Sequence, residues 1–199
     1  MYVVTYFTND LYRSYAEQMI ASVERFGFEG MAVKVPNLGS WRANTEYKCR
    51  FLYEALDRLQ QDLLWLDADS KMVNKPVLLK EVDGHIACYW DETGNPATPG
   101  TPFSGTLLVR NTDPARWFLR RWDTLNKTSP KEQDDRNVRA AFESTPDNPT
   151  VKDGVTTQNP YMKVTRLPVE YCWAEHLMAH RHPNANPVIL QFMVSREKA

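Results

Sequence analysis

The chain has 199 residues, 42% of them hydrophobic, which is enough to bury one core and predicts a single domain over 1–199. Its formal net charge of −1 excludes a global field that would draw it to nucleic acid or to acidic membranes. No apolar stretch approaches the roughly 18 residues that span a bilayer, and the first residues lack the basic region of a signal peptide. The three separated cysteines show no metal-ligand spacing, so we expect a cytoplasmic protein with reduced thiols and no membrane partner.

The first seventy residues alternate between strand and helix patterns. A helix with capping residues at Thr8-Asn9-Asp10 follows the first strand, and a second helix is expected to open at Asn44-Thr45. The three expected strands are 2–7, 31–35 and 63–66. This order predicts a parallel sheet with right-handed crossovers.

Two carboxylates directly follow the third strand. Leu63 to Leu66 is a run of large apolar residues typical of a strand covered on both faces, and it ends in Asp67 and Asp69. Because side chains alternate along a strand, both acids are expected on one side, at the sheet edge where α/β proteins bind ligands. Mg²⁺ prefers such oxygen ligands together with substrate phosphates. A polar turn after a strand is the alternative, since Asp is a common turn residue.

Basic residues gather around the start of the second helix. Arg42, Lys48 and Arg50 lie where the helix dipole disfavours cations. A bound diphosphate would compensate their charge. The alternatives are a solvated basic face, or pairing of Lys48 with Glu46 or Asp10.

The second half of the chain is less regular. We expect a short helix at 77–79, loops at 91–101 and 143–158, and strands and helices elsewhere. The expected strands are 85–90, 103–110 and 188–192, and the expected helices are 114–125 and 130–142.

Gly105 interrupts one of these strands between Ser104 and Thr106. A glycine inside a strand often marks the close approach of a ligand or of another backbone. A bulge with surface hydroxyls is the alternative.

Glu132, Gln133 and Asp134 open the helix at 130–142. Acids in a first helical turn favour the dipole and have an ordinary structural explanation, but the three side chains also suit sugar hydroxyls. Near the C-terminus, His176 and His180 have helical spacing without the Glu of a zinc-protease motif, which favours a surface helix end.

Together these segments resemble the GT-A class of nucleotide-diphospho-sugar glycosyltransferases, most closely the small members of bacteriophages and bacteria. The resemblance covers nearly the whole chain. It implies an α/β Rossmann-like domain with a mixed, mainly parallel sheet flanked by helices. The segments that carry it are Val-Val-Thr-Tyr at 3–6, Trp41 through Lys48, Leu-Trp-Leu-Asp-Ala-Asp at 64–69, Phe-Ser-Gly-Thr-Leu-Leu-Val at 103–109, Leu-Pro-Val-Glu-Tyr-Cys-Trp at 167–173 and Val-Ser-Arg at 194–196.

Glu132 through Asn137 is similar to the Asp-Gln-Asp-x-Leu-Asn element of glycogenin-like transferases. Glu132 replaces the first Asp of that element, and Arg136 replaces its Leu.

The resemblance implies transfer of a sugar from a nucleoside diphosphate, with UDP-sugars foremost, to a hydroxyl group. Residues 1–70 would form a nucleotide-binding half and 71–199 an acceptor and sugar half. Asp69, with Asp67 and Gln191, would bind Mn²⁺ or Mg²⁺, and one of Glu132, Gln133 and Asp134 would act in catalysis. The expected nucleotide-sugar contacts are Thr5, Tyr6, Arg42, Lys48, Asp67, Ser104, Gly105, Thr106 and Arg196.

The acceptor is predicted from charge as well as resemblance. Residues 110–139 contain an excess of basic residues, which suits the phosphates of DNA. Phage members of the resembled class glycosylate hydroxymethylated bases. Together these points favour DNA as the acceptor, in a bacterial or phage-infected cell. A saccharide or small-molecule acceptor, a non-catalytic nucleotide-sugar or nucleic-acid binding module and a nucleotidyltransferase remain alternatives. The last is disfavoured because the loop after the first strand has no Gly-rich basic motif. The sequence gives no oligomeric state.

Overall fold

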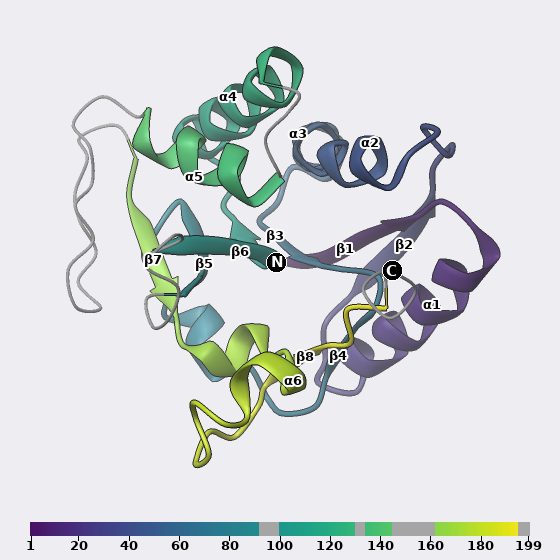
Figure 1. Ribbon diagram of the computed structural model, residues 1–199, viewed down its shortest axis with the longest axis vertical. Helices are drawn as coiled ribbons and strands as arrows, with labels where there is room; N and C mark the ends of the chain where they lie inside the picture. The colour runs from purple at the N-terminus through teal and green to yellow at the C-terminus, as the bar shows by residue number, and fades with distance from the viewer. Residues whose placement is uncertain (92–99, 130–133, 145–161, 195–199) are drawn as a thin grey trace.

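A six-stranded mixed sheet forms the centre of the molecule, in a computed structural model that describes residues 1–91, 100–129, 134–144 and 162–194 (Figure 1). The strand order is β2-β1-β3-β6-β5-β7, and β6 alone among these strands runs antiparallel to its neighbours. The strands are β1 (Tyr2–Phe7), β2 (Gly30–Lys34), β3 (Leu63–Leu66), β5 (Ile86–Asp91), β6 (Thr101–Val109) and β7 (Val164–Leu167).

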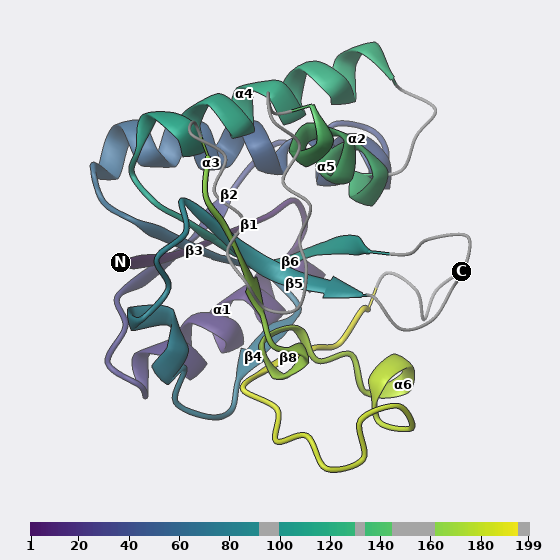
Figure 2. The ribbon, with the colours of Figure 1, turned by 90° about the vertical axis from the view of Figure 1, so that its left-hand side faces the viewer.

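Helices cover both faces of the sheet (Figure 2). One face carries α2, α3, α4 and α5, and the other carries α1 with a two-stranded sheet, β4-β8. The helices are α1 (Asp10–Glu24), α2 (Trp41–Glu46), α3 (Lys48–Leu59), α4 (Asp113–Thr128), α5 (Asp134–Glu143) and α6 (Glu175–Met178). The remaining elements are β4 (Ser70–Met72), β8 (Ile189–Gln191) and the 3₁₀ helices at Val77–Lys80 and Val169–Cys172.

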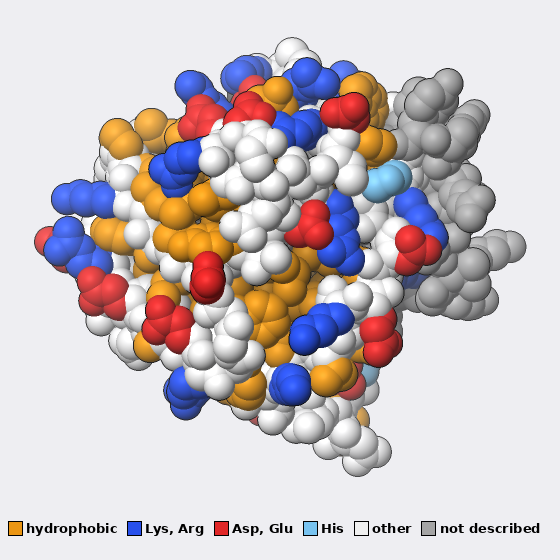
Figure 3. Space-filling model, turned by 180° about the vertical axis from the view of Figure 1, so that it is seen from behind, with side chains coloured by type: hydrophobic (Ala, Val, Ile, Leu, Met, Phe, Trp, Pro, Cys, Tyr) orange, Lys and Arg blue, Asp and Glu red, His pale blue; other side chains and the backbone are white. Residues whose placement is uncertain are grey.

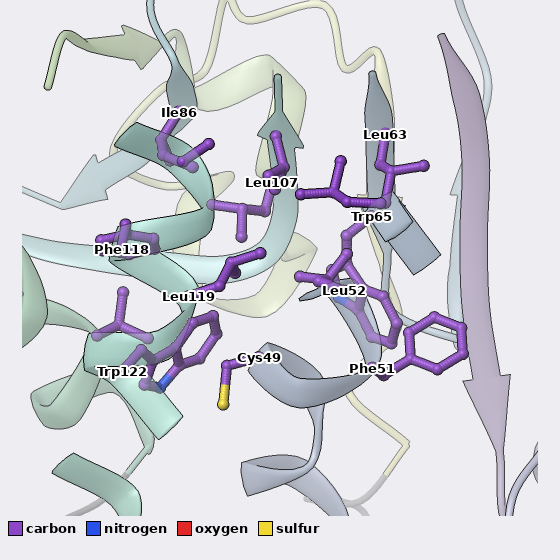
Figure 4. Close-up of a cluster of buried hydrophobic side chains, with 14 of the residues drawn as sticks. Cys49, Phe51, Leu52, Leu63, Trp65, Ile86, Leu107, Phe118, Leu119 and Trp122 are labelled. Atoms are coloured by element: carbon purple, nitrogen blue, oxygen red, sulfur yellow. The ribbon is translucent and has the colours of Figure 1, made fainter. Parts of the chain in front are cut away.

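The main core lies between the sheet and the helices α3 and α4 (Figure 4). Apolar residues at helical spacing on α3, such as Leu52, meet Trp65 of β3, while Phe118 and Trp122 of α4 fill the space toward β5 and β6. All four strand residues of β3 are buried, as expected of a central strand with helices on both faces. This packing holds the end of β3 rigidly in place.

The predicted fold class is confirmed, including the mixed, mainly parallel sheet. The predicted start of the second helix is wrong. Ser40, whose side chain accepts a hydrogen bond from the N–H of Ala43, caps α2 so that it begins at Trp41, and Tyr47 separates α2 from α3. Asn44 had suggested the cap, but its side chain instead accepts from the N–H of Leu38 at 2.8 Å. Most of the expected loops 91–101 and 143–158 lies outside the described residues.

All three cysteines are free and buried, as expected for reduced thiols. Over the described part of the chain, every helix is too short or too polar to cross a membrane. His176 lies in α6 and His180 just after it, and both are exposed.

Candidate active site

A cavity of about 680 Å³ opens where β1 and β3 end. Helices α1 and α2 follow β1 and β2 onto opposite faces of the sheet, which leaves a crevice of the kind in which α/β proteins bind ligands. The cavity is lined by the chain segments at 6–12, 37–48, 65–69 and 103–105, and by Cys172, Ala174, Gln191 and Met193. Both predicted acids, Asp67 and Asp69, are in this wall.

Asp67 continues the pairing of β3 with β6. Its N–H donates to the carbonyl of Gly105 at 3.0 Å, directly after the Leu66–Thr106 pair of the ladder. The indole N–H of Trp65 donates to Asp67 Oδ1 at 2.8 Å, and the ammonium of Lys48 lies 3.0 Å from the same oxygen. One carboxylate oxygen is therefore held by the protein, and Oδ2 faces the space above Gly105.

Lys48 lines the cavity but is almost fully buried, with its ammonium directed at Asp67 and β6. Its Nζ donates to the carbonyl and the hydroxyl of Ser104 at 3.1 and 3.0 Å, in addition to the contact with Asp67. It also lies 5.2 Å from the centre of the Trp65 ring. An ammonium has three N–H donors, so these three acceptors match its capacity. Lys48 thereby balances the charge of Asp67 and ties α3 to β6.

Asp69 is clamped by the backbone that follows β8. The N–H of Val194 donates to Asp69 Oδ2 at 2.8 Å, and the N–H of Phe192 donates to its carbonyl at 3.0 Å. Met193, between these donors, has φ of +54°, a conformation that is uncommon outside glycine and concentrates at functional sites. Burial, and then the nearby charge of Asp67, raise the pKa of Asp69, while the Val194 N–H opposes this rise.

Gln191 lies beside the acids although it is far away in sequence. Its Nε2 donates to the hydroxyl of Thr106 at 3.0 Å, and its Oε1 accepts from the hydroxyl of Ser70 at 2.8 Å. A Cβ at Gly105 would lie 3.0 Å from Gln191 Oε1 and 3.3 Å from Asp67 Oδ2. Gly105 thus keeps open a small space bounded by two oxygen atoms, and these side chains provide the close approach that its place in the strand indicated.

These oxygens suit a hard divalent cation. Two carboxylates and one ammonium leave one negative charge at this point, and among the described residues no Lys or Arg pairs with Asp69. Carboxylate and amide oxygens are the ligands that Mg²⁺ and Mn²⁺ prefer. No cluster of three His, Cys, Asp or Glu side chains occurs in the described part, so Gln191 would be the third protein ligand.

The remaining predicted residues are distributed more widely. Thr5 is fully buried in β1, whereas Tyr6 lines the cavity and donates its hydroxyl to the carbonyl of Asn44. Arg42 forms an ion pair with Glu46 at 2.6 Å within α2. Glu132, Gln133 and Arg196 lie outside the described residues, as does the side chain of Asp134, the first residue of α5.

Sequence reasoning missed several parts of the wall, among them the following two. One is the loop before α2, where Ser40 and Trp41 line the cavity and the Ser40 N-cap was the available signal. The other is Cys172, whose thiol has a pKa raised by burial to about 12 and is therefore an unreactive wall group.

No family model and no curated protein sequence matches the chain. Solved structures match its fold. A glycosyltransferase involved in glycosylating the major capsid of the virus PBCV-1 has a TM-score of 0.69 and 13% identity, over 97% of this chain and 92% of the other. The galactosyltransferase LgtC, solved with donor and acceptor sugar analogues, has a TM-score of 0.58 and 13% identity, over 97% and 87%.

A third match is the glycosyltransferase GlyE of Streptococcus pneumoniae TIGR4. Its TM-score is 0.59 at 14% identity, over 96% of this chain but 54% of GlyE. The chain has a GT-A fold. In this GT-A fold the acids after β3, the Gly105 space and Gln191 meet at one point of the cavity.

Proposed function

We propose that the chain is a glycosyltransferase that moves a sugar from a nucleoside-diphosphate sugar to a hydroxyl acceptor. The observation that carries the proposal is the excess negative charge of Asp67 and Asp69 in a cavity whose surrounding fold is that of solved glycosyltransferases. Fold alone does not decide function, but the acids supply the chemistry at the expected place. A UDP-sugar is the first donor to test, on the strength of the sequence resemblance.

In the proposed reaction, the bond between the anomeric carbon and the diphosphate oxygen breaks as the acceptor oxygen bonds to that carbon. The hydroxyl proton leaves to solvent or to a carboxylate, and a nucleoside diphosphate departs. Mn²⁺ or Mg²⁺, held by Asp69, Asp67 and Gln191, would neutralise the charge that develops on the diphosphate. Lys48 and Trp65 fix the direction of Asp67, and the backbone of Val194 fixes that of Asp69.

A thermal-shift screen tests this function. Nucleoside diphosphates and their sugars are added with and without Mn²⁺, because a ligand that binds only the folded state raises its melting temperature. We expect at least one nucleotide sugar to raise it in a Mn²⁺-dependent way. A panel in which no nucleotide or nucleotide sugar shifts the transition contradicts the proposal.

For the acceptor, we favour a sugar hydroxyl over a base in DNA. Several of the basic residues that suggested DNA form ion pairs: Arg110 with Asp62 at 2.7 Å, Arg116 with Asp57, and Lys127 with Asp123. Figure 3 shows a face on which Lys and Arg side chains alternate with Asp and Glu rather than forming one basic surface. LgtC was solved with an acceptor sugar analogue, which supports a saccharide.

A hydroxymethylated base in DNA remains the second candidate because Arg120 of α4 is exposed to solvent beside these pairs. Titration with duplex DNA at low and moderate salt separates the two acceptors. Binding through phosphates weakens steeply with salt, so salt-sensitive binding would favour DNA and its absence would exclude it.

A further inference from the structure

Trp41 is the most exposed large hydrophobic side chain of the described residues, at 63%, yet it lines the cavity. Exposing an indole to water is unfavourable, and Trp is more often largely buried. Trp117 on α4 is a useful contrast, since it is 37% exposed and does not line the cavity.

The backbone beneath Trp41 is firmly held. The Ser40 N-cap fixes the first turn of α2. The side-chain oxygen Oδ1 of Asn37 accepts from the N–H of Gly39 at 2.9 Å and from the side-chain amide of Asn44 at 3.1 Å. The Asn44 side chain in turn accepts from the N–H of Leu38. The indole is therefore presented to the cavity by a preorganised loop, which reduces the entropy lost when a ligand packs on it.

The residues that line the cavity follow the order of the strands in the sheet. The loop before Trp41 follows β2, Asn9 follows β1, the acids follow β3, and Gly105 lies on β6, in the spatial order β2-β1-β3-β6. Figure 1 shows α2 over the β1–β2 side of the sheet. Since β2 and β3 are two strand spacings apart, about 10 Å, the loop after β2 and the acids after β3 lie apart along this wall.

We infer that Trp41 is the stacking platform for the nucleobase of the donor. This inference rests on the proposed function, which assigns the diphosphate to the acids, and it places the sugar on the side of Gly105, a predicted nucleotide-sugar contact. The remaining end of the ligand is planar and aromatic, and it falls on the side of Trp41. Stacking accepts any base, so Trp41 contributes affinity without choosing between pyrimidine and purine.

The test is isothermal titration of UDP, GDP and inorganic pyrophosphate in the presence of Mn²⁺. For Trp41→Ala we expect the affinity for both nucleotides to fall about ten- to hundredfold, the usual effect of removing one stacked aromatic ring. Pyrophosphate binding should be unchanged, Trp41→Phe should retain most of the affinity, and Trp117→Ala should match the wild type.

Three results overturn the inference. The first is a Trp41→Ala variant that binds UDP as tightly as the wild type. The second is a loss of pyrophosphate affinity in Trp41→Ala that parallels the loss for the nucleotides. A higher KM for the acceptor with unchanged nucleotide affinity would place Trp41 in the acceptor site instead. If the wild type itself binds neither nucleotide, both the proposed function and this inference are wrong. If the wild type binds nucleotides but Trp41→Ala binds them equally well, only the inference is wrong.

Discussion

Replacing Lys48 with Met removes the ammonium at the centre of the candidate site while keeping an apolar stem of similar length. The Ser104 carbonyl then loses a buried hydrogen bond, which costs about 1–3 kcal/mol. Asp67 loses its counter-charge, but its side chain is 36% exposed, so water replaces part of the pairing and we set this loss at about 1 kcal/mol. The free energy of unfolding should fall by about 3 kcal/mol, which lowers the melting temperature by roughly 6–12 °C.

Chemical denaturation and calorimetry of Lys48→Met measure this change. Arg50→Met is the matched control, because Arg50 lies on the same helix and pairs with Glu54 at 2.9 Å, with 61% and 50% of the two side chains exposed. Because water screens such an exposed surface pair, its loss should change stability little. The structural role of Lys48 is refuted if Lys48→Met is no less stable than Arg50→Met. A loss of nucleotide affinity without loss of stability would show instead that Lys48 is a phosphate ligand.

Two further predictions concern close packing and pH. Gly105→Ala places a methyl group against Gln191, so we expect a loss of about 1–3 kcal/mol in stability together with weaker Mn²⁺ binding by titration; unchanged values for both would contradict the packing. Burial, and then the charge of Lys163, lower the pKa of His85, whose Nδ1 accepts from the N–H of Lys163 at 2.9 Å. Neutral His85 therefore contributes to stability fully above about pH 6.5. The contribution is lost as the pH falls, because the unfolded chain then binds a proton at His85 more readily than the folded chain does. His85→Asn should therefore show a smaller loss of stability than the wild type between pH 7 and pH 5, and equal losses would contradict the assignment.

Local patterns predicted the frame of the candidate site. The apolar run of β3 predicts a central strand without knowledge of the strands beside it, because a strand covered on both faces needs continuous large side chains. It therefore placed Asp67 and Asp69 at the correct sheet edge. Gly105 indicated the close approach of a ligand or of another backbone, and the structure places the side chains of Gln191 and Asp67 against it.

Contacts between distant segments were not predictable in this way. The pairing of Lys48 with Asp67 depends on how α3 crosses β3, and the sequence suggested only nearer partners such as Glu46. The backbone clamp on Asp69 comes from residues 192–194, which reach it because β8 pairs with β4. β4 is only three residues long, too short for a recognisable pattern. The roles of Glu132 and Gln133 stay predictions.

The most direct test of the proposed function is slow hydrolysis of nucleotide sugars without an acceptor. A panel of UDP- and GDP-sugars is incubated with the protein and Mn²⁺, and the released nucleoside diphosphate is measured. We predict release from at least one donor, its loss with EDTA, and a fall of about a hundredfold or more in Asp69→Asn, the size of loss when one charge-stabilising group is removed from an active site. Release that persists at the wild-type rate in EDTA and in a folded Asp69→Asn variant would contradict the assignment of Asp69 to a metal-dependent transfer.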